Sequence, residues 1–158
     1  MSDITETRTP PQVDVRRPRF VAWVTTAVLV ATVLTSTSST AVAAVILGVQ
    51  AVVFAIGAAL GPRRHPYGLV FATLIGPRLG PVTEREPVAP LKFAQLVGFV
   101  FAVIGVIGFA SGLSLLGLIA TGFALVAAFL NAAFGICLGC QLYPLVALLR
   151  PKLSTSTT

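Results

Sequence analysis

Four long apolar stretches, separated by two short polar turns and one long charged segment, form the main pattern of the chain. Each is close to the roughly 20 residues that a helix needs to cross a bilayer core of about 30 Å. The expected spans are residues 20–37, 41–60, 93–110 and 113–134. Because lipid offers no hydrogen-bond partner to the backbone, each span must be helical. The pattern therefore predicts an all-α membrane protein with four transmembrane helices.

Composition agrees with this class. Hydrophobic residues make up 56% of the chain and charged residues 10%, and the mean hydropathy is +0.94. These values exclude an ordinary water-soluble domain. The net charge of +6 is explained by a basic surface that attracts anionic lipid. The expected partner is therefore the lipid bilayer, and no nucleic acid is expected.

The basic residues predict how the spans are oriented. All of them lie before the first span, in the loop 61–92 or after the last span, and none lies in the two short turns. Since Lys and Arg favour cytoplasmic loops, both termini and this loop should face the cytoplasm. We expect a multi-pass protein of the inner (cytoplasmic) membrane. Its parts would be a flexible cytosolic arm (1–15), one transmembrane domain (16–152) and a disordered tail (153–158).

The two halves of the chain share a sequence pattern around their spans. Proline, a basic residue and Phe precede the first and third spans, in Arg17-Pro-Arg-Phe20 and Pro90-Leu-Lys-Phe93. The second and fourth spans are followed by Tyr67-Gly-Leu-Val70 and Tyr143-Pro-Leu-Val146. This similarity predicts two parallel helical-hairpin repeats, each followed by a short amphipathic or interfacial segment. Chance likeness between apolar helices with Arg and Pro at their ends is the alternative.

Length also favours a separate segment after the last span. A continuous helix over residues 113–149 would run about 55 Å, nearly twice the hydrocarbon thickness. A break is therefore expected at Gly135, Gly139 or Pro144. The following apolar residues would then lie at the cytosolic interface.

The only two cysteines, Cys137 and Cys140, form a Cys-x-x-Cys motif at the inner boundary of the last span. At this spacing an attacking thiolate and a resolving thiol can close a disulfide with little backbone movement. They supply only two of the four ligands that zinc prefers, and His65 is the only histidine, so no metal site is expected. Ordinary packing of two small apolar side chains remains an alternative. In the cytosol the pair would normally be reduced.

Aligning Tyr67 with Tyr143 places Arg64 opposite Cys140, so pseudo-symmetry would bring a basic cluster to face the cysteines. Such a cluster would favour the thiolate and bind an anionic sulfur compound. The candidate substrate-binding residues are Arg63, Arg64, His65 and Tyr143. In the alternative interpretation Arg63 and Arg64 face lipid phosphate and His65 is an ordinary loop residue.

Several segments together resemble a bacterial membrane family, frequent in actinobacteria, that is catalogued as domain of unknown function 4395. They are Val13-Asp-Val-Arg-Arg-Pro-Arg-Phe20, His65-Pro-Tyr-Gly68, Pro77-Arg-Leu-Gly80, Phe93-Ala-Gln95 and Phe134-Gly-Ile-Cys-Leu-Gly-Cys140 through Tyr143. The resemblance runs from about Val13 to Lys152, and its most specific part is the cysteine motif. It implies no established activity, but it implies partners among thioredoxin-like and sulfurtransferase proteins. One departure is Leu91-Lys92, where the family pattern leads us to expect proline and arginine.

The sequence therefore predicts that a cytosol-facing Cys137/Cys140 dithiol takes part in thiol-disulfide or sulfane-sulfur transfer. Its partner would be a soluble thioredoxin-like or sulfurtransferase protein, and a homo-oligomer stays open. The alternatives are a non-enzymatic subunit or small permease for a sulfur-containing anion, and a structural scaffold. No acidic residue lies in any span, which disfavours a proton-coupled transporter. Neither a phosphate-binding glycine loop nor a Ser/His/Asp set is visible, so no cofactor is expected.

Overall fold

The computed structural model describes residues 9–150, so the predicted tail 153–158 and most of the predicted N-terminal arm lie outside the described residues. The N-terminal half contains β1 (Gln12–Asp14), α1 (Arg16–Ser36), α2 (Thr40–Leu60), α3 (Pro66–Val70), the π-helical η1 (Phe71–Ile75) and the 3-10 helix η2 (Gly76–Arg78). The C-terminal half contains β2 (Arg85–Pro87), α4 (Val88–Ala110), α5 (Ser114–Phe134) and α6 (Leu138–Leu149).

The four predicted spans are confirmed as long helices: α1, α2, α4 and α5 are each long and apolar enough to cross a membrane. Two of them begin earlier than expected, α1 at Arg16 and α4 at Val88. Pro18 and Pro90 each stand in the first turn of these helices, where a backbone N–H has no intrahelical acceptor. Proline therefore costs no hydrogen bond at these positions, and the helices extend through it.

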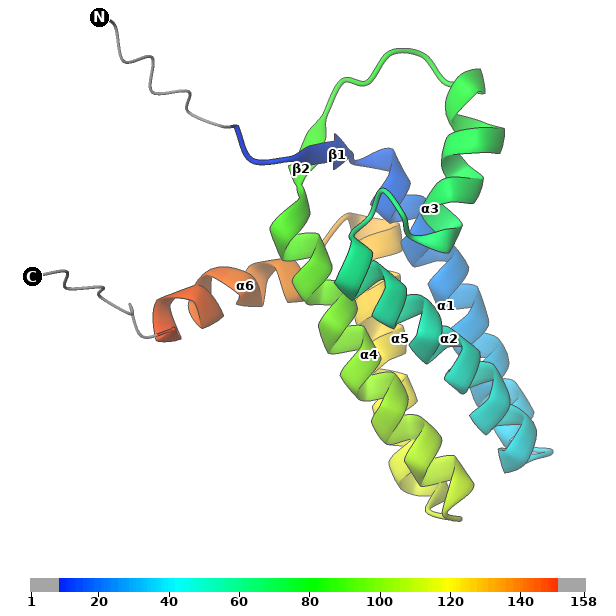
Figure 1. Cartoon of the computed structure of the whole chain (residues 1–158). Coiled ribbons are helices and arrows are strands. Elements are labelled where there is room, and N and C mark those ends of the chain that lie inside the picture. Colours follow the sequence, from blue (N-terminus) through cyan, green and yellow to red (C-terminus); the bar gives the residue numbers. More distant parts are fainter. Residues whose placement is uncertain (1–8, 151–158) are drawn as a thin grey trace, which may run out of the picture.

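The four long helices form one bundle (Figure 1). α1 pairs with α2 and α4 with α5, while α2 also packs on α4 and α1 on α5. Large core side chains fill the space between them, with Leu29, Leu47 and Phe109 almost completely buried. Because each helix touches two neighbours, the bundle closes into a ring.

Both short turns lie at the same end of this bundle, the lower end in Figure 1. Ser39 caps α2 by accepting a hydrogen bond from the Val42 N–H at 3.3 Å. Gly112 links α4 to α5 with a φ of +81°, a left-handed conformation that favours glycine. These local features bring each pair of helices back antiparallel.

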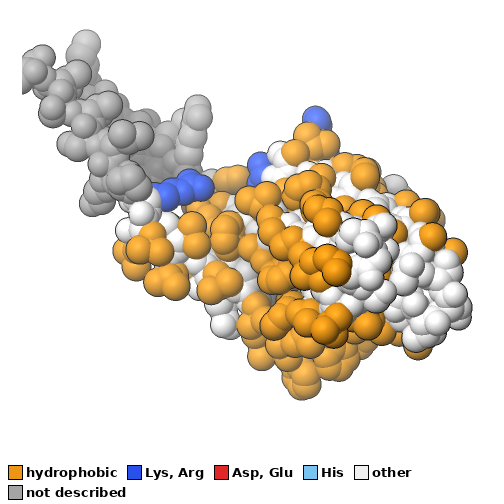
Figure 2. All heavy atoms as spheres, turned by 90° about the horizontal axis from the view of Figure 1, so that it is seen from below, with side chains coloured by type: hydrophobic (Ala, Val, Ile, Leu, Met, Phe, Trp, Pro, Cys, Tyr) orange, Lys and Arg blue, Asp and Glu red, His pale blue; other side chains and the backbone are white. Residues whose placement is uncertain are grey.

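Large hydrophobic side chains cover the outside of the bundle, as expected for contact with lipid. Val45 is 68% exposed and Leu115 is 71% exposed. Figure 2 views the end that carries the short turns; hydrophobic side chains dominate it, and Lys and Arg appear only at its margin. The exterior thus supports a multi-pass membrane protein.

The charged end of the molecule contains a small sheet that the sequence did not predict. β1 and β2 pair antiparallel, with Val13 opposite Glu86. Arg16 forms an ion pair of 2.8 Å with Asp14, and this partner lowers the pKa of the Asp14 carboxyl. Three-residue strands carry little sequence signal, because their pairing depends on residues far apart in the chain. The sheet ties the N-terminal arm to the segment before α4.

Candidate functional site

The cysteine motif lies where α5 ends and α6 begins. Gly135 terminates α5 with a φ of +69°, and its N–H donates to the Asn131 carbonyl. Of the three expected break points, Gly135 is the one used, whereas Gly139 and Pro144 lie inside α6. Left-handed glycines commonly end helices in this way, because they redirect the chain without steric cost. The break places Cys137 directly before the first turn of α6.

Cys137 and Cys140 are joined as a disulfide within that turn. Their Cα atoms are 5.1 Å apart, within the usual range for a disulfide. Cys137 is the N-cap residue of α6, and its Sγ accepts a hydrogen bond from the Cys140 N–H at 3.3 Å. The prediction that one helical turn brings the two sulfurs together is confirmed. The two sulfurs are bonded in this structure, and the reduced form expected in the cytosol stays a prediction.

α6 is fixed to the bundle by two contacts with α4. At Gly139, an added Cβ atom would lie 2.6 Å from both Cα and Cβ of Ala94, so only glycine permits this close approach. One turn further, the rings of Tyr143 and Phe93 meet edge to face with centroids 6.0 Å apart. Tyr143, a predicted substrate-binding residue, thus packs against α4. These contacts hold the cysteine turn in a fixed position.

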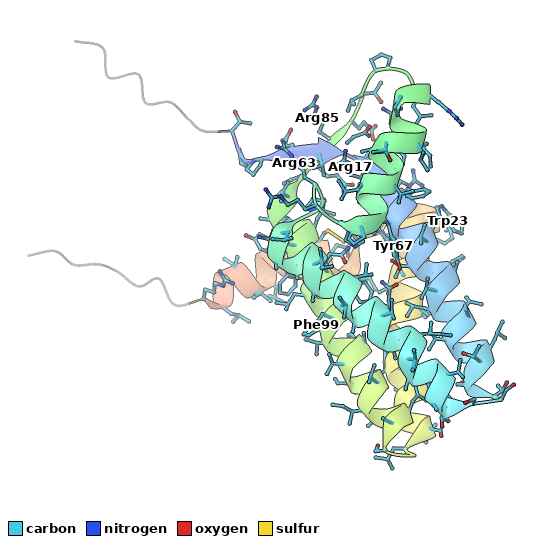
Figure 3. The ribbon with its side chains drawn as sticks, turned by 45° about the vertical axis from the view of Figure 1, so that its right-hand side comes forward. Arg17, Trp23, Arg63, Tyr67, Arg85 and Phe99 are labelled. Carbon is cyan, nitrogen blue, oxygen red and sulfur yellow. A yellow bond between two sulfur atoms is a disulfide. The ribbon has the colours of Figure 1, made fainter. Side chains whose placement is uncertain are left out.

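The two arginines of the predicted basic cluster lie on the surface at the charged end of the molecule. The Arg63 guanidinium donates to the Gln12 carbonyl at 3.4 Å, and the side chain of Arg64 is exposed. Figure 3 shows Arg63 close to β1. Within residues 9–150, no hydrogen bond or ion pair joins Arg63, Arg64 or His65 to the cysteines.

His65 lies in the protein interior, where only 1% of it is exposed. Its ring lies 5.4 Å from the Tyr67 ring, and the Tyr67 hydroxyl donates to Gln50 Oε1 at 2.8 Å. A Cβ atom at Gly57 would lie 2.6 Å from His65 Cδ2 and 3.0 Å from the Gln95 side chain, so these groups converge on one spot. The result is a buried polar cluster between α2, α3 and α4.

Burial lowers the pKa of His65 to about 4, and the nearby Gln95 amide opposes this shift to a smaller extent. Among the described residues, neither ring nitrogen has a partner in hydrogen-bond geometry. His65 is therefore neutral at pH 7. The positive charge of the predicted cluster comes from Arg63 and Arg64 alone.

We expect acid to destabilise the protein through His65. Its pKa in the folded chain, about 4, lies below the ordinary value of 6.5, so the unfolded chain binds more protons between these pH values. The melting temperature should therefore fall by several degrees as the pH drops from 6.5 to 4. Thermal unfolding in detergent would measure this. His65→Gln, which cannot titrate, should lose most of the slope; an unchanged slope would contradict the assignment.

A cavity of about 270 Å³ lies inside the bundle next to the cysteine turn. Helices α1, α4 and α5 and the start of α6 form most of its wall, and Cys137 is one of the residues that line it. The lining is apolar except for a few polar side chains, namely Thr25, Gln95 and Asn131. Sequence reasoning missed this cavity, because small residues such as Gly98 and Ala128 signal close packing and empty space equally well.

A family model described as Domain of unknown function (DUF4395) matches residues 13–147. The chain belongs to this family. The match spans both hairpins and the cysteine turn, so the predicted family resemblance is confirmed over the whole bundle. The DUF4395 description assigns no activity. No curated protein and no solved structure matches the chain. Within residues 9–150 of this DUF4395 member, no three His, Cys, Asp or Glu side chains gather as metal ligands would.

Proposed function

We propose that this membrane protein carries out thiol-disulfide exchange through Cys137 and Cys140. The observation that carries the proposal is the placement of both sulfurs in the first turn of α6, joined as a disulfide beside a helix N-terminus. This arrangement supports thiol-disulfide exchange more directly than sulfane-sulfur transfer, because the second cysteine lies within reach to resolve a mixed disulfide.

Cys137 is the attacking cysteine in this proposal. In the disulfide its Sγ lies at the N-terminus of α6 and accepts the Cys140 N–H, a position that the reduced Cys137 would keep in this proposal. That hydrogen bond and the positive end of the helix dipole both stabilise a thiolate. The Cys137 thiolate attacks a partner disulfide and releases one partner thiolate. Cys140 then attacks Cys137 Sγ, which closes the internal disulfide and releases the second partner thiolate, so the partner leaves reduced.

The partner would approach from the charged end of the bundle. Figure 3 shows Arg17, Arg63 and Arg85 at this end, on the side opposite the two short turns. The excess of Arg and Lys there supports a cytosolic orientation in the cytoplasmic membrane with both termini inside. We propose that the exposed Arg63 and Arg64 help to hold an anionic face of a thioredoxin-like or sulfurtransferase partner.

We also propose that the two hairpins are related by an axis along the membrane normal. Three features support this relation. α2 packs on α4 as α1 packs on α5, Phe20 of α1 contacts Phe71 after α2, and Phe93 of α4 contacts Tyr143 after α5. In both halves, the segment after the hairpin folds back on the start of the first helix. The segments differ in form, because α6 is one regular helix whereas α3 passes into η1 and η2.

Sided thiol labelling tests the orientation and access of the site. After reduction, a membrane-impermeant maleimide should label the chain in inverted vesicles and leave it unlabelled in intact cells, because only the cytosolic side exposes the cysteines. The Cys137→Ser/Cys140→Ser double variant, which has no other cysteine, is the control. A purified reduced thioredoxin should also open the disulfide in inverted vesicles. Labelling from outside alone would overturn the topology and the proposed partner together.

A further inference from the structure

The cavity beside Cys137 has the features of a binding site that the proposed exchange does not use. We propose that it binds the ring of a lipid-soluble quinone, which accepts two electrons from the reduced Cys137/Cys140 pair. This inference rests on the proposed exchange reaction running in reverse, in which a reduced thioredoxin-like partner opens the disulfide and leaves oxidised. The quinone is then the acceptor of the two electrons that the partner has given to the pair. The site lies between α1, α4 and α5, within the part of the molecule that would be in the membrane.

An unpartnered polar group in the cavity, the Thr25 hydroxyl, suits a quinone. Thr25 is 3% exposed, lines the cavity, and its hydroxyl has no hydrogen-bond partner in the described structure. Gln95 also lines the cavity, but its side-chain oxygen lies on the His65 side, 3.0 Å from a Cβ atom built at Gly57. Leaving a buried polar group without a partner costs about 1–3 kcal/mol. A quinone carbonyl accepts a hydrogen bond from the Thr25 hydroxyl, and the hydroxyl of the reduced ring donates to the Thr25 oxygen.

Size and access favour a ring that carries an apolar tail. The volume of about 270 Å³ is slightly below the roughly 300–1,000 Å³ of most small-molecule pockets. It therefore suits a ring headgroup rather than a whole lipid. Phe101 and Phe123 both line the cavity, with ring centroids 5.8 Å apart, and Phe123 is 61% exposed on the outside of the bundle. The cavity lining thus reaches the outer surface of the bundle at Phe123, where a tail would enter the bilayer.

The position of Cys137 in the cavity wall favours a quinone over an ordinary acyl chain as the occupant of the cavity. An acyl chain would fill apolar space, but it would use neither Thr25 nor the adjacent redox pair. In the proposed reaction, the two thiols lose two electrons and two protons as the bond between the sulfurs forms. The quinone takes up both electrons and both protons and becomes a hydroquinone. The chain has only two cysteines, so no second internal pair can take these electrons.

The test uses the full-length protein in quinone-free nanodiscs. The reduced protein is mixed anaerobically with a ubiquinone that has a single isoprene unit. Quinone absorbance and thiol alkylation are followed together, and one quinone should be reduced for each disulfide formed. Thr25→Val should raise the half-saturating quinone concentration about fivefold, as expected for the loss of one hydrogen bond.

Filling the cavity tests its location. Ala128→Phe places a ring inside it and should slow quinone reduction at least roughly tenfold, whereas Val126→Phe on the same helix should have no effect. Val126 is 55% exposed and does not line the cavity. Unchanged melting temperatures would show that both variants fold. If Ala128→Phe does not fold, Thr25→Val serves as the test of the site. Equal rates of quinone reduction in wild type and all variants would show that the cavity is not the quinone site.

Wild-type behaviour separates the two proposals. Exchange with thioredoxin without any quinone reduction would overturn the quinone inference and leave the proposed function standing. Failure of both reactions would overturn both. Binding of the quinone without oxidation of the thiols would make the cavity a lipid site and would also contradict the inference.

Discussion

Replacing Cys140 with serine should leave a redox partner covalently attached to Cys137, whereas replacing Cys137 should abolish the adduct. The Cys137 sulfur lies at the N-terminus of α6 and accepts the Cys140 N–H, so its thiolate is stabilised for attack. Without the Cys140 thiol the mixed disulfide has no internal resolving group and accumulates. Serine at position 137 cannot form a disulfide at all. Nonreducing electrophoresis of inverted vesicles incubated with oxidised thioredoxin measures the adduct.

Two outcomes of this experiment would change the conclusions. An adduct that forms with Cys137→Ser and not with Cys140→Ser would reverse the roles of the two cysteines. If neither variant forms an adduct while wild type remains fully reduced beside the oxidised partner, the cysteines have a packing role and the exchange reaction is wrong. The double serine variant supplies the background in each case.

Replacing Gly108 with leucine should prevent the C-terminal hairpin from packing. A Cβ atom there would lie 2.5 Å from the Gly117 backbone nitrogen and 2.9 Å from its Cα, so the clash is with the backbone of α5 and no side-chain rotation relieves it. Overpacking typically costs about 1–3 kcal/mol, and a leucine pressed between two helix backbones belongs at or beyond the upper end. Thermal unfolding and size-exclusion chromatography in detergent would show a large loss of folded protein.

Gly48→Leu is the matched control for this prediction. A Cβ atom at Gly48 meets no atom within 4 Å, so the same substitution in α2 encounters open space. It should be tolerated, because leucine also has the higher helix propensity. Equal melting temperatures for the two variants would mean that α4 and α5 do not approach as closely as the structure has them.

Local sequence features were enough to predict part of the candidate site. The hydrophobic pattern predicted four helices, and residue spacing predicted that Cys137 and Cys140 can bond, because both properties depend on neighbours within a few turns of helix. The excess length of an unbroken last helix predicted a break, and Gly135 provides it.

Other parts of the site depend on distant segments and could not be predicted. His65 was expected in a basic loop cluster, but it is buried beside Tyr67 and close to Gln95 of α4. Nothing in the sequence near His65 indicates which helix will cover it. The same holds for Thr25, whose unpartnered hydroxyl is notable only because α4 and α5 enclose a cavity beside it.

The sequence by itself determined the class of the protein, its four helices, its family and the short-range geometry of the cysteine pair. These follow from hydrophobicity, helix length and spacing, which act locally. The tertiary structure decided which helices meet, that α6 docks on α4 through Gly139, and that Cys137 lines a cavity. Such contacts depend on how side chains from separate helices pack together or leave a cavity between them. A single sequence does not show which helices will be neighbours, so it does not predict this packing.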